Sequence, residues 1–251
     1  MIDFIVPDWT GVPANVGALS TTRRGGVSRA PYGDGAGGGG LNLGTHVGDR
    51  PEDVMHNRVL LRSLLPAEPA WLSQIHGTAV LDAARTSGVP EADACIAAEP
   101  GAVCVIQTAD CLPVLFCDTQ GRVVGAAHAG WRGLAGGVLE NTLAAMRGAG
   151  AEDILAWLGP AIGPDRFEVG EDVLAAFTER GQETRPAFKP IPGRPGKYLA
   201  DIYSLARTLL RKAGVAGVHG GGACTVTDER RFYSYRREKT TGRMASLIWL
   251  K

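Results

Sequence analysis

The chain has 251 residues, 45% of them hydrophobic, and its 26 basic residues equal its 26 acidic residues in number. This length and apolar content are enough for one large domain with a sizeable core. The balanced charge gives no overall field that would attract nucleic acid or a membrane surface, and no stretch approaches the roughly 20 apolar residues of a membrane span. The N-terminal segment lacks a basic start, and the five cysteines have no framework spacing. We therefore expect a reduced, cytoplasmic protein with no implied partner protein.

Short strand-like runs and helical patterns are interspersed along the chain. In chain order, the expected elements are a strand at Gly17–Thr21, a helix at Pro51–Leu65, strands at Val103–Gln107, Pro113–Cys117 and Val123–Ala127, a helix at Leu134–Arg147, a strand at Ile154–Leu158, helices at Gly170–Arg180 and Asp201–Ala213, and a strand at Ser246–Leu250. The Pro-Glu-Asp start of the first helix and the side chain of Asp201 are typical of helix N-termini. Because there is no regular βαβ alternation and no linker, the pattern favours an α+β fold, a single domain over residues 1–251 with mixed β-sheets flanked by helices.

Two segments at expected strand ends carry the clearest chemical signal. Thr108–Cys111 follows one apolar run, and Ala126–Gly133 ends another. A strand and the turn-like segment Asp118–Gly121 lie between them, so a β-hairpin would bring Cys111 and His128 together. A thiolate and an imidazole that converge on one point can bind a soft divalent metal or act as a nucleophile and its base.

A third candidate ligand, His76, follows a short apolar stretch and precedes a glycine. One sulfur and two nitrogens suit zinc and also copper, and three protein ligands are typical of a catalytic site that keeps a position open. The chain has no C-x-x-C or H-x-x-x-H pair, which disfavours a zinc ribbon or finger. Two alternatives remain: Cys111 as a metal-free nucleophile with His128 as its base, or a closed structural site with Cys224 as the fourth ligand.

Several polar residues are candidates for ligand binding. Arg23 with the glycines that follow it can form an anion cradle, or it can be a surface arginine in a tight hairpin. Arg236 is a candidate for binding phosphate or carboxylate, because the neutral net charge disfavours a nucleic-acid role for its basic segment. His46 can line a pocket or lie on the surface. The cysteines expected to be inert core residues are Cys95, Cys104 and Cys117.

The chain resembles the laccase-domain family, also described as polyphenol oxidase-like or purine nucleoside phosphorylase, whose bacterial members are called peptidoglycan editing factors. The segments that carry the resemblance run in order through nearly the whole chain: Thr22–Ser28, Leu41–Gly44, Val47–Asp49, Gln74–Gly77, Thr108–Phe116, Ala127–Gly133, Leu158–Pro164, Phe167–Gly170, Tyr233–Arg237 and Thr241–Ala245. One departure is a glycine-rich expansion at Gly33–Gly40, which we expect to lengthen a loop at the pocket rim.

The resemblance implies a zinc-dependent enzyme that acts on purine nucleosides. Adenosine, inosine or methylthioadenosine would be split by phosphate to the base and ribose 1-phosphate, and a zinc-activated water would deaminate adenosine. By position, the metal ligands would be His76, Cys111 and His128. The catalytic residues would be Asp110, Cys111 and His128, with Asp110 transferring protons beside the metal. Phosphate and substrate would be bound by Arg23, Asn42 and Arg236.

Two other activities compete with this interpretation. The same zinc or thiol site could remove a wrongly incorporated amino acid from a UDP-MurNAc peptidoglycan precursor. A copper polyphenol oxidase is less favoured, because a blue-copper centre alone consumes two histidines and one cysteine. Only three histidines would then remain for a trinuclear cluster: His46, His56 and His219. We therefore expect any Cu²⁺ to be adventitious in a zinc site.

Overall fold

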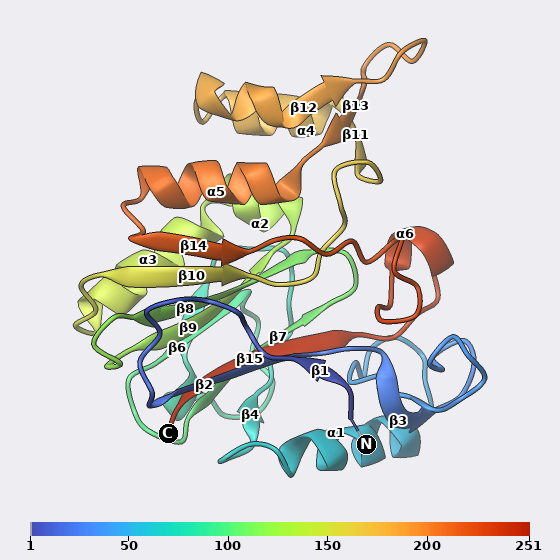
Figure 1. Cartoon of the computed structure of the whole chain (residues 1–251), viewed down its shortest axis with the longest axis vertical. Coiled ribbons are helices and arrows are strands. Elements are labelled where there is room, and N and C mark those ends of the chain that lie inside the picture. The colour runs from blue at the N-terminus through green and yellow to red at the C-terminus, as the bar shows by residue number, and fades with distance from the viewer. Residues whose placement is uncertain (1) are drawn as a thin grey trace.

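Two β-sheets packed face to face form the centre of the computed structural model, which describes residues 2–251 (Figure 1). The first sheet is antiparallel except at its β7–β4 edge. In spatial order it contains β1 (Phe4–Ile5), β2 (Val16–Thr21), β15 (Met244–Leu250), β7 (Val103–Thr108) and β4 (Pro69–Ala70). The second sheet has a parallel pair at each edge. It contains β14 (Gly217–Gly220), β10 (Ile154–Leu158), β8 (Leu112–Asp118), β9 (Val124–Ala129), β6 (Ala94–Ala97) and β5 (Val80–Asp82).

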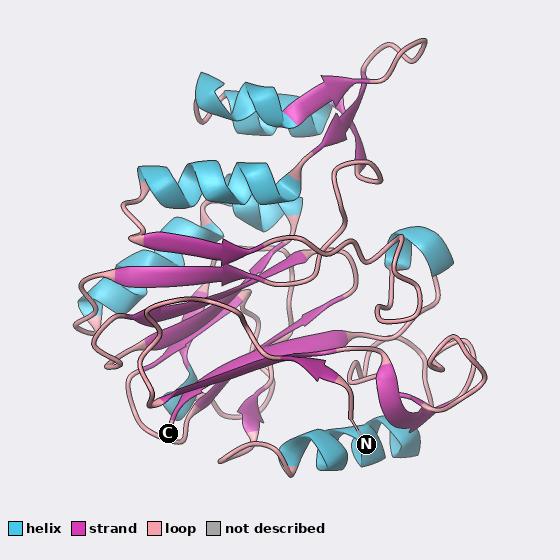
Figure 2. Cartoon of the chain, viewed as in Figure 1, coloured by secondary structure: helices cyan, strands magenta, loops and turns pink. Residues whose placement is uncertain are grey.

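A small antiparallel sheet lies at one end of the long axis, beside α4 (Figures 1 and 2). Its strands are β11 (Glu168–Gly170), β13 (Lys197–Ala200) and β12 (Phe188–Pro190), and a separate short strand is β3 (Arg24–Ser28). The α-helices are α1 (Pro51–Arg62), α2 (Trp131–Gly136), α3 (Val138–Gly148), α4 (Glu171–Thr178), α5 (Ile202–Lys212) and α6 (Tyr235–Glu238). Two 3₁₀ turns are η1 (Ala83–Arg85) and η2 (Gln182–Ala187). No helix within residues 2–251 is long and apolar enough to cross a membrane.

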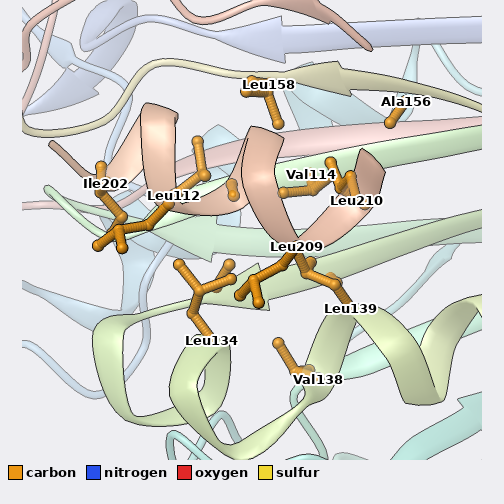
Figure 3. Packing of buried hydrophobic residues seen from close by; sticks show 14 of the residues in the cluster. Leu112, Val114, Leu134, Val138, Leu139, Ala156, Leu158, Ile202, Leu209 and Leu210 are labelled. Carbon is orange, nitrogen blue, oxygen red and sulfur yellow. The ribbon is translucent and has the colours of Figure 1, made fainter. Parts of the chain in front are cut away.

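Helices cover the outer faces of the two central sheets, so the molecule has four layers. On the first sheet, Leu61 of α1 packs into a buried cluster with Leu19 and Val105. On the second sheet, α2, α3 and α5 contribute Leu134, Leu139 and Leu209 to the largest core cluster (Figure 3). Each fully buried aliphatic side chain of this kind contributes roughly 1.5–3 kcal/mol of hydrophobic stabilisation.

Strand β8 shows why the sequence favours this layering. Successive side chains of a strand point to opposite faces of its sheet. Leu112, Val114 and Phe116 belong to the core under the helices, whereas Leu115 and Cys117 belong to the core between the two sheets. Because both faces are buried, the strand reads as a continuous apolar run rather than an alternating one.

The expected α+β fold with mixed sheets and flanking helices is confirmed, and each of the six predicted strands overlaps an observed one. One expectation is wrong in detail: residues 134–147 do not form a single helix. Gly137 has φ 104°, a left-handed conformation that ends α2 and begins α3. The Arg180 side chain donates hydrogen bonds to the Leu134 and Ala135 carbonyl oxygens. Two carbonyl oxygens of the last turn of α2, which have no partner within the helix, thereby receive hydrogen bonds.

Candidate metal centre

The β8–β9 hairpin brings Cys111 and His128 together, as the sequence predicts. Cys111 immediately precedes β8, and His128 in β9 pairs with Pro113. His76 reaches the same point from the loop between β4 and β5. The candidate ligand atoms of the three residues all lie within 4.8 Å of one another, and Cys111 Sγ is 3.7 Å from His76 Nε2.

The absence of a side chain at Gly130 allows the three ligands to converge. A Cβ atom at this position would lie 2.7 Å from His76 Cδ2 and 3.1 Å from Cys111 Sγ. Gly130 also precedes α2, so the chain turns from β9 into the helix directly behind the ligands. This site therefore requires glycine for close approach.

Charge is arranged to keep the Cys111 sulfur ionised. Burial alone would raise the pKa of the Cys111 thiol, but His128 and His76 outweigh it and lower that pKa to about 6. Burial would likewise lower the pKa of His128, but Cys111 and Asp93 raise it to about 9. Without a metal, the pair is therefore a thiolate and an imidazolium at neutral pH.

The donor set fits a metal ion such as zinc. A thiolate sulfur and two imidazole nitrogens are zinc ligands, and three protein ligands leave a fourth position for water or substrate. His128 is buried, Cys111 is half-buried and His76 is exposed, so the centre opens toward solvent on the His76 side. Cys224 is not part of this group; its sulfur instead accepts a hydrogen bond from the Gly163 backbone N–H.

A cavity of ≈ 670 Å³ adjoins the centre and contains two arginines. Arg58 lies 3.8 Å above the Trp71 ring and donates from Nε to the Leu43 carbonyl oxygen. Arg243 donates to the carbonyl oxygens of Thr241 and Gly242. Burial lowers the pKa of both guanidinium groups, yet neither makes an ion pair with a carboxylate within residues 2–251. Two partly buried cations that have no ion-pair partner of their own favour binding of an anion.

His46 and Tyr235 also line this cavity. Burial and the two arginines lower the pKa of His46, so it adds a neutral imidazole at neutral pH rather than a third positive charge. The Tyr235 side chain is exposed and presents an aromatic surface at the cavity rim. Of the two sequence-based alternatives for His46, the structure thus supports the one in which it lines a pocket.

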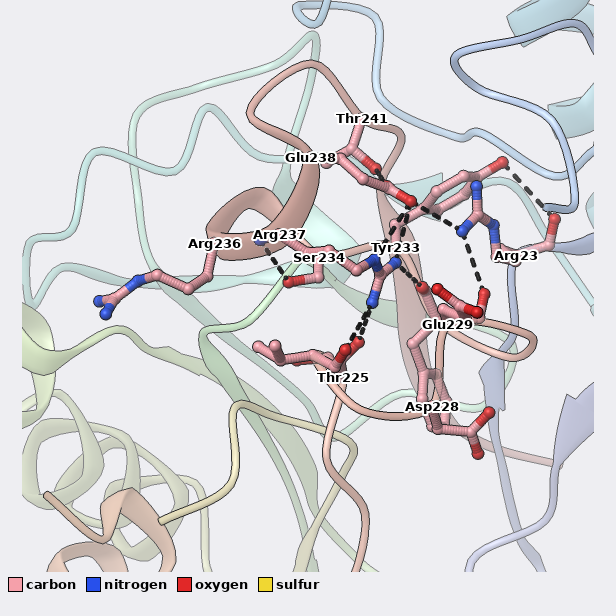
Figure 4. A network of polar contacts seen from close by, with 12 residues as sticks. Arg23, Thr225, Asp228, Glu229, Tyr233, Ser234, Arg236, Arg237, Glu238 and Thr241 are labelled. Carbon is pink, nitrogen blue, oxygen red and sulfur yellow. Dashed lines mark hydrogen bonds and ion pairs between the residues drawn. The ribbon is translucent and has the colours of Figure 1, made fainter. Parts of the chain in front are cut away.

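The residues expected to bind phosphate lie elsewhere. Arg23 is buried and donates to the Gly33 and Glu229 carbonyl oxygens and to Glu238 Oε1, which is 3.1 Å away (Figure 4). Asn42 is fully buried and accepts a 2.9 Å hydrogen bond from the Arg243 backbone N–H. Arg236 donates to the Glu168 carbonyl oxygen, 3.1 Å away. None of Arg23, Asn42 and Arg236 lines the cavity beside the metal centre.

The structure also places Asp110 and the glycine-rich loop. Asp110, with φ 94°, uses both carboxylate oxygens to accept hydrogen bonds, from the Thr225 hydroxyl and from the Arg236 backbone N–H. It therefore anchors two neighbouring segments beside Cys111. The loop Gly33–Gly40 lines a separate cavity with Arg23 instead of the rim of the metal-centre cavity.

Sequence reasoning missed Asp93, Arg58 and Arg243. Asp93 is the one acidic residue in the apolar segment 92–98, a position where a charge needs a buried partner. Arg243 lies in the segment Thr241–Ala245, which the resemblance already singled out. Arg58 sits on the same helical face as Val54 and Leu61, so its charge faces inward.

Comparison with known proteins identifies the family of this chain. The family described as multi-copper polyphenol oxidoreductase laccase matches residues 17–251. This chain belongs to that family. A relative named purine nucleoside phosphorylase from Pseudomonas aeruginosa is 53% identical over 99% of this chain and 98% of its own length. The purine nucleoside phosphorylase YfiH of Escherichia coli is 50% identical over the whole of both chains.

Solved structures of the laccase-like family share the fold. The crystal structure of a Neisseria meningitidis protein assigned to DUF152 superposes with a TM-score of 0.91 at 52% identity, covering 99% of both chains. YlmD from Geobacillus stearothermophilus superposes with a TM-score of 0.83 at 31% identity, covering 99% of this chain and 96% of its own. The names of the curated relatives support an enzymatic role for this family member.

Proposed function

We propose that this protein is a zinc-dependent purine nucleoside phosphorylase that also deaminates adenosine. The observation that carries the proposal is a three-ligand metal centre and two guanidinium groups without ion-pair partners in one cavity. Phosphorolysis needs a nucleoside and a phosphate anion side by side, and the two arginines beside the metal centre support binding of the anion there. The relatives named purine nucleoside phosphorylase supply the substrate class.

Arg58 and Arg243 replace Arg23, Asn42 and Arg236 as our candidates for holding phosphate. Charge-assisted hydrogen bonds to a guanidinium orient phosphate and bring it close to the sugar. The Tyr235 ring at the rim provides a surface on which a purine base can stack. Zinc, when bound, supplies Lewis-acid polarisation of a substrate group.

The deciding experiment is product chromatography after metal-quantified protein is incubated with adenosine, with and without phosphate. The proposal expects adenine and ribose 1-phosphate only when phosphate is present, and inosine in either case. Unchanged adenosine from protein that holds one zinc per chain would rule the proposal out.

One observation favours a second candidate, a thiol hydrolase that acts on a peptidoglycan precursor. Cys111, His128 and Asp93 have the arrangement of a nucleophile, its base and an orienting carboxylate, with His128 Nδ1 2.7 Å from Asp93 Oδ1. Chelation and alkylation separate the two candidates. An activity that survives zinc removal but is abolished by iodoacetamide would support the thiol route, whereas loss on chelation that added zinc restores supports the metal route.

A further inference from the structure

Asp93 connects the two histidines of the metal centre without belonging to the ligand set. It is fully buried immediately before β6. Its Oδ1 accepts hydrogen bonds from the His76 backbone N–H at 2.9 Å and from His128 Nδ1 at 2.7 Å. Its Oδ2 accepts from the backbone N–H groups of Ile75 at 3.1 Å and Gly77 at 2.6 Å. One carboxylate thus receives four hydrogen bonds from two ligand-bearing segments.

Only an ionised carboxylate can accept all four bonds. Its two oxygens offer about four acceptor positions, whereas an amide has a single acceptor oxygen and an NH₂ group that donates. The four donors that converge on Asp93 therefore match the ionised carboxylate and not a neutral side chain.

The bond to His128 fixes which ring nitrogen faces the ligand cluster. With the proton on Nδ1 and directed at Asp93, Nε2 is the nitrogen that is free to bind a metal. The bonds to residues 75–77 act on the second histidine through its backbone. His76 has φ 61°, a conformation that costs a non-glycine residue energy and persists only when its surroundings hold it. The three successive backbone N–H groups of residues 75–77 donate to Asp93 Oδ1 and Oδ2 and stabilise this backbone conformation of His76.

We propose that Asp93 is the positioning residue of the metal centre, because one buried carboxylate orients both histidine ligands at once and thereby sets metal affinity. This inference rests on the metal-dependent function proposed above. Asp93 acts through His76 and His128, and it contacts neither the ion nor the substrate.

The test compares zinc affinities of the whole protein by competition with a chromogenic chelator. We expect Asp93→Asn to weaken zinc binding about 10- to 100-fold, because the amide cannot accept all four hydrogen bonds. The matched control is Asp118→Asn, at the end of β8 that is remote from Cys111. Asp118 is also fully buried and accepts bonds from the Arg122 and Val123 backbone N–H groups and from Arg122 Nε. This control should lower the melting temperature while it leaves the zinc dissociation constant within about twofold.

The outcomes are distinct. Zinc affinity that falls in Asp93→Asn but not in Asp118→Asn supports the positioning role. Equal zinc affinity in Asp93→Asn and the unmodified protein overturns it, and so does an equal loss in both variants, since that is a general stability effect.

A second measurement on the unmodified protein does not depend on the variants folding. Long-range ¹H–¹⁵N spectra of the zinc-loaded protein should show the His128 proton on Nδ1. A proton on Nε2 of His128 overturns the proposal. Because neither readout uses nucleoside turnover, a missing phosphorolysis activity would reject the proposed function and leave the positioning role standing.

Discussion

At the scale of single residues, the metal centre depends on the absence of a side chain at Gly130. Its missing Cβ leaves the space in which His76 and Cys111 approach each other. The approach of Cys111 to His128 could be predicted from sequence, since a local hairpin joins them, whereas His76 was included as a ligand through the family resemblance. The two cavity arginines could not be predicted from sequence, because Arg58 and Arg243 lie far apart along the chain and only tertiary packing brings them together.

Gly130→Ala should reduce zinc binding more than tenfold, because the added methyl group would overlap the His76 ring and press on Cys111 Sγ. The loss of binding is measured as the zinc content of each variant after dialysis against a zinc buffer. Gly148→Ala is the control, since a Cβ there meets nothing within 4 Å. If both alanine variants retain one zinc per chain, the close-approach argument fails.

Arg58→Met and Arg243→Met should each raise the KM for phosphate by roughly 10- to 100-fold, because each removes a charge-assisted hydrogen bond of about 1.5–3 kcal/mol. Adenosine deamination, which needs no phosphate, should change much less in the same preparations. Arg23→Met tests the earlier candidate: losing its hydrogen bond to Glu238, which keeps Arg237 as a partner, should cost roughly 1.5–3 kcal/mol of stability without a selective effect on phosphate. A phosphate-specific defect in Arg23→Met alone would reverse this assignment.

At the scale of elements, the segment from Thr225 to Thr241 is held by side chains rather than by a strand or long helix. Arg237 donates to the Thr225, Val226 and Phe232 carbonyl oxygens, and Glu238 accepts from Arg23 and Thr241 (Figure 4). Such a network leaves no periodic pattern, which explains why sequence reasoning placed no element here. The β8–β9 hairpin was predictable for the opposite reason: its apolar runs and turn are local.

Glu238 makes this network sensitive to acid. Burial would raise its pKa, but Thr241, Arg23 and Arg237 outweigh burial and lower it below 4.5. A lowered carboxyl pKa gives stability that is present above pH 4.5 and is lost as the pH falls through the folded-state pKa. Glu238→Gln should therefore be less stable than the unmodified protein at pH 6, and the difference should shrink below pH 4.5. Urea unfolding midpoints between pH 6 and 3.5 measure it; a constant difference would exclude this role.

At the scale of the whole molecule, the metal centre gathers side chains from separate segments of the chain. His128 lies in β9 of the second sheet and Cys111 immediately precedes β8 of that sheet, whereas His76 lies in the loop that runs from β4 of the first sheet to β5 of the second. The four layers follow from the apolar patterns of the strands and helices. The strand orders, the parallel edge pairs and the small third sheet were not predictable, because they depend on pairings between residues far apart in the sequence.

Zinc should stabilise the folded chain, because it binds the folded state and holds the loop that carries His76 against the β8–β9 hairpin. A free zinc concentration 1,000-fold above its dissociation constant adds about 4 kcal/mol, or roughly 10 °C in melting temperature for a chain of this size. Differential scanning fluorimetry with and without chelator measures the shift. His76→Ala should melt at nearly the same temperature in both buffers, and a full zinc-dependent shift in that variant would contradict the role of His76 as a ligand.

The four hydrogen bonds on Asp93 have a practical consequence for anyone who purifies this protein. They hold both histidines through contacts made entirely within the polypeptide, so an ion can leave and another can enter without refolding. Copper binds nitrogen and sulfur ligands more strongly than zinc does. We therefore expect trace copper in the buffers to displace zinc during purification, and assays should begin from protein that has been stripped and reloaded with one defined ion.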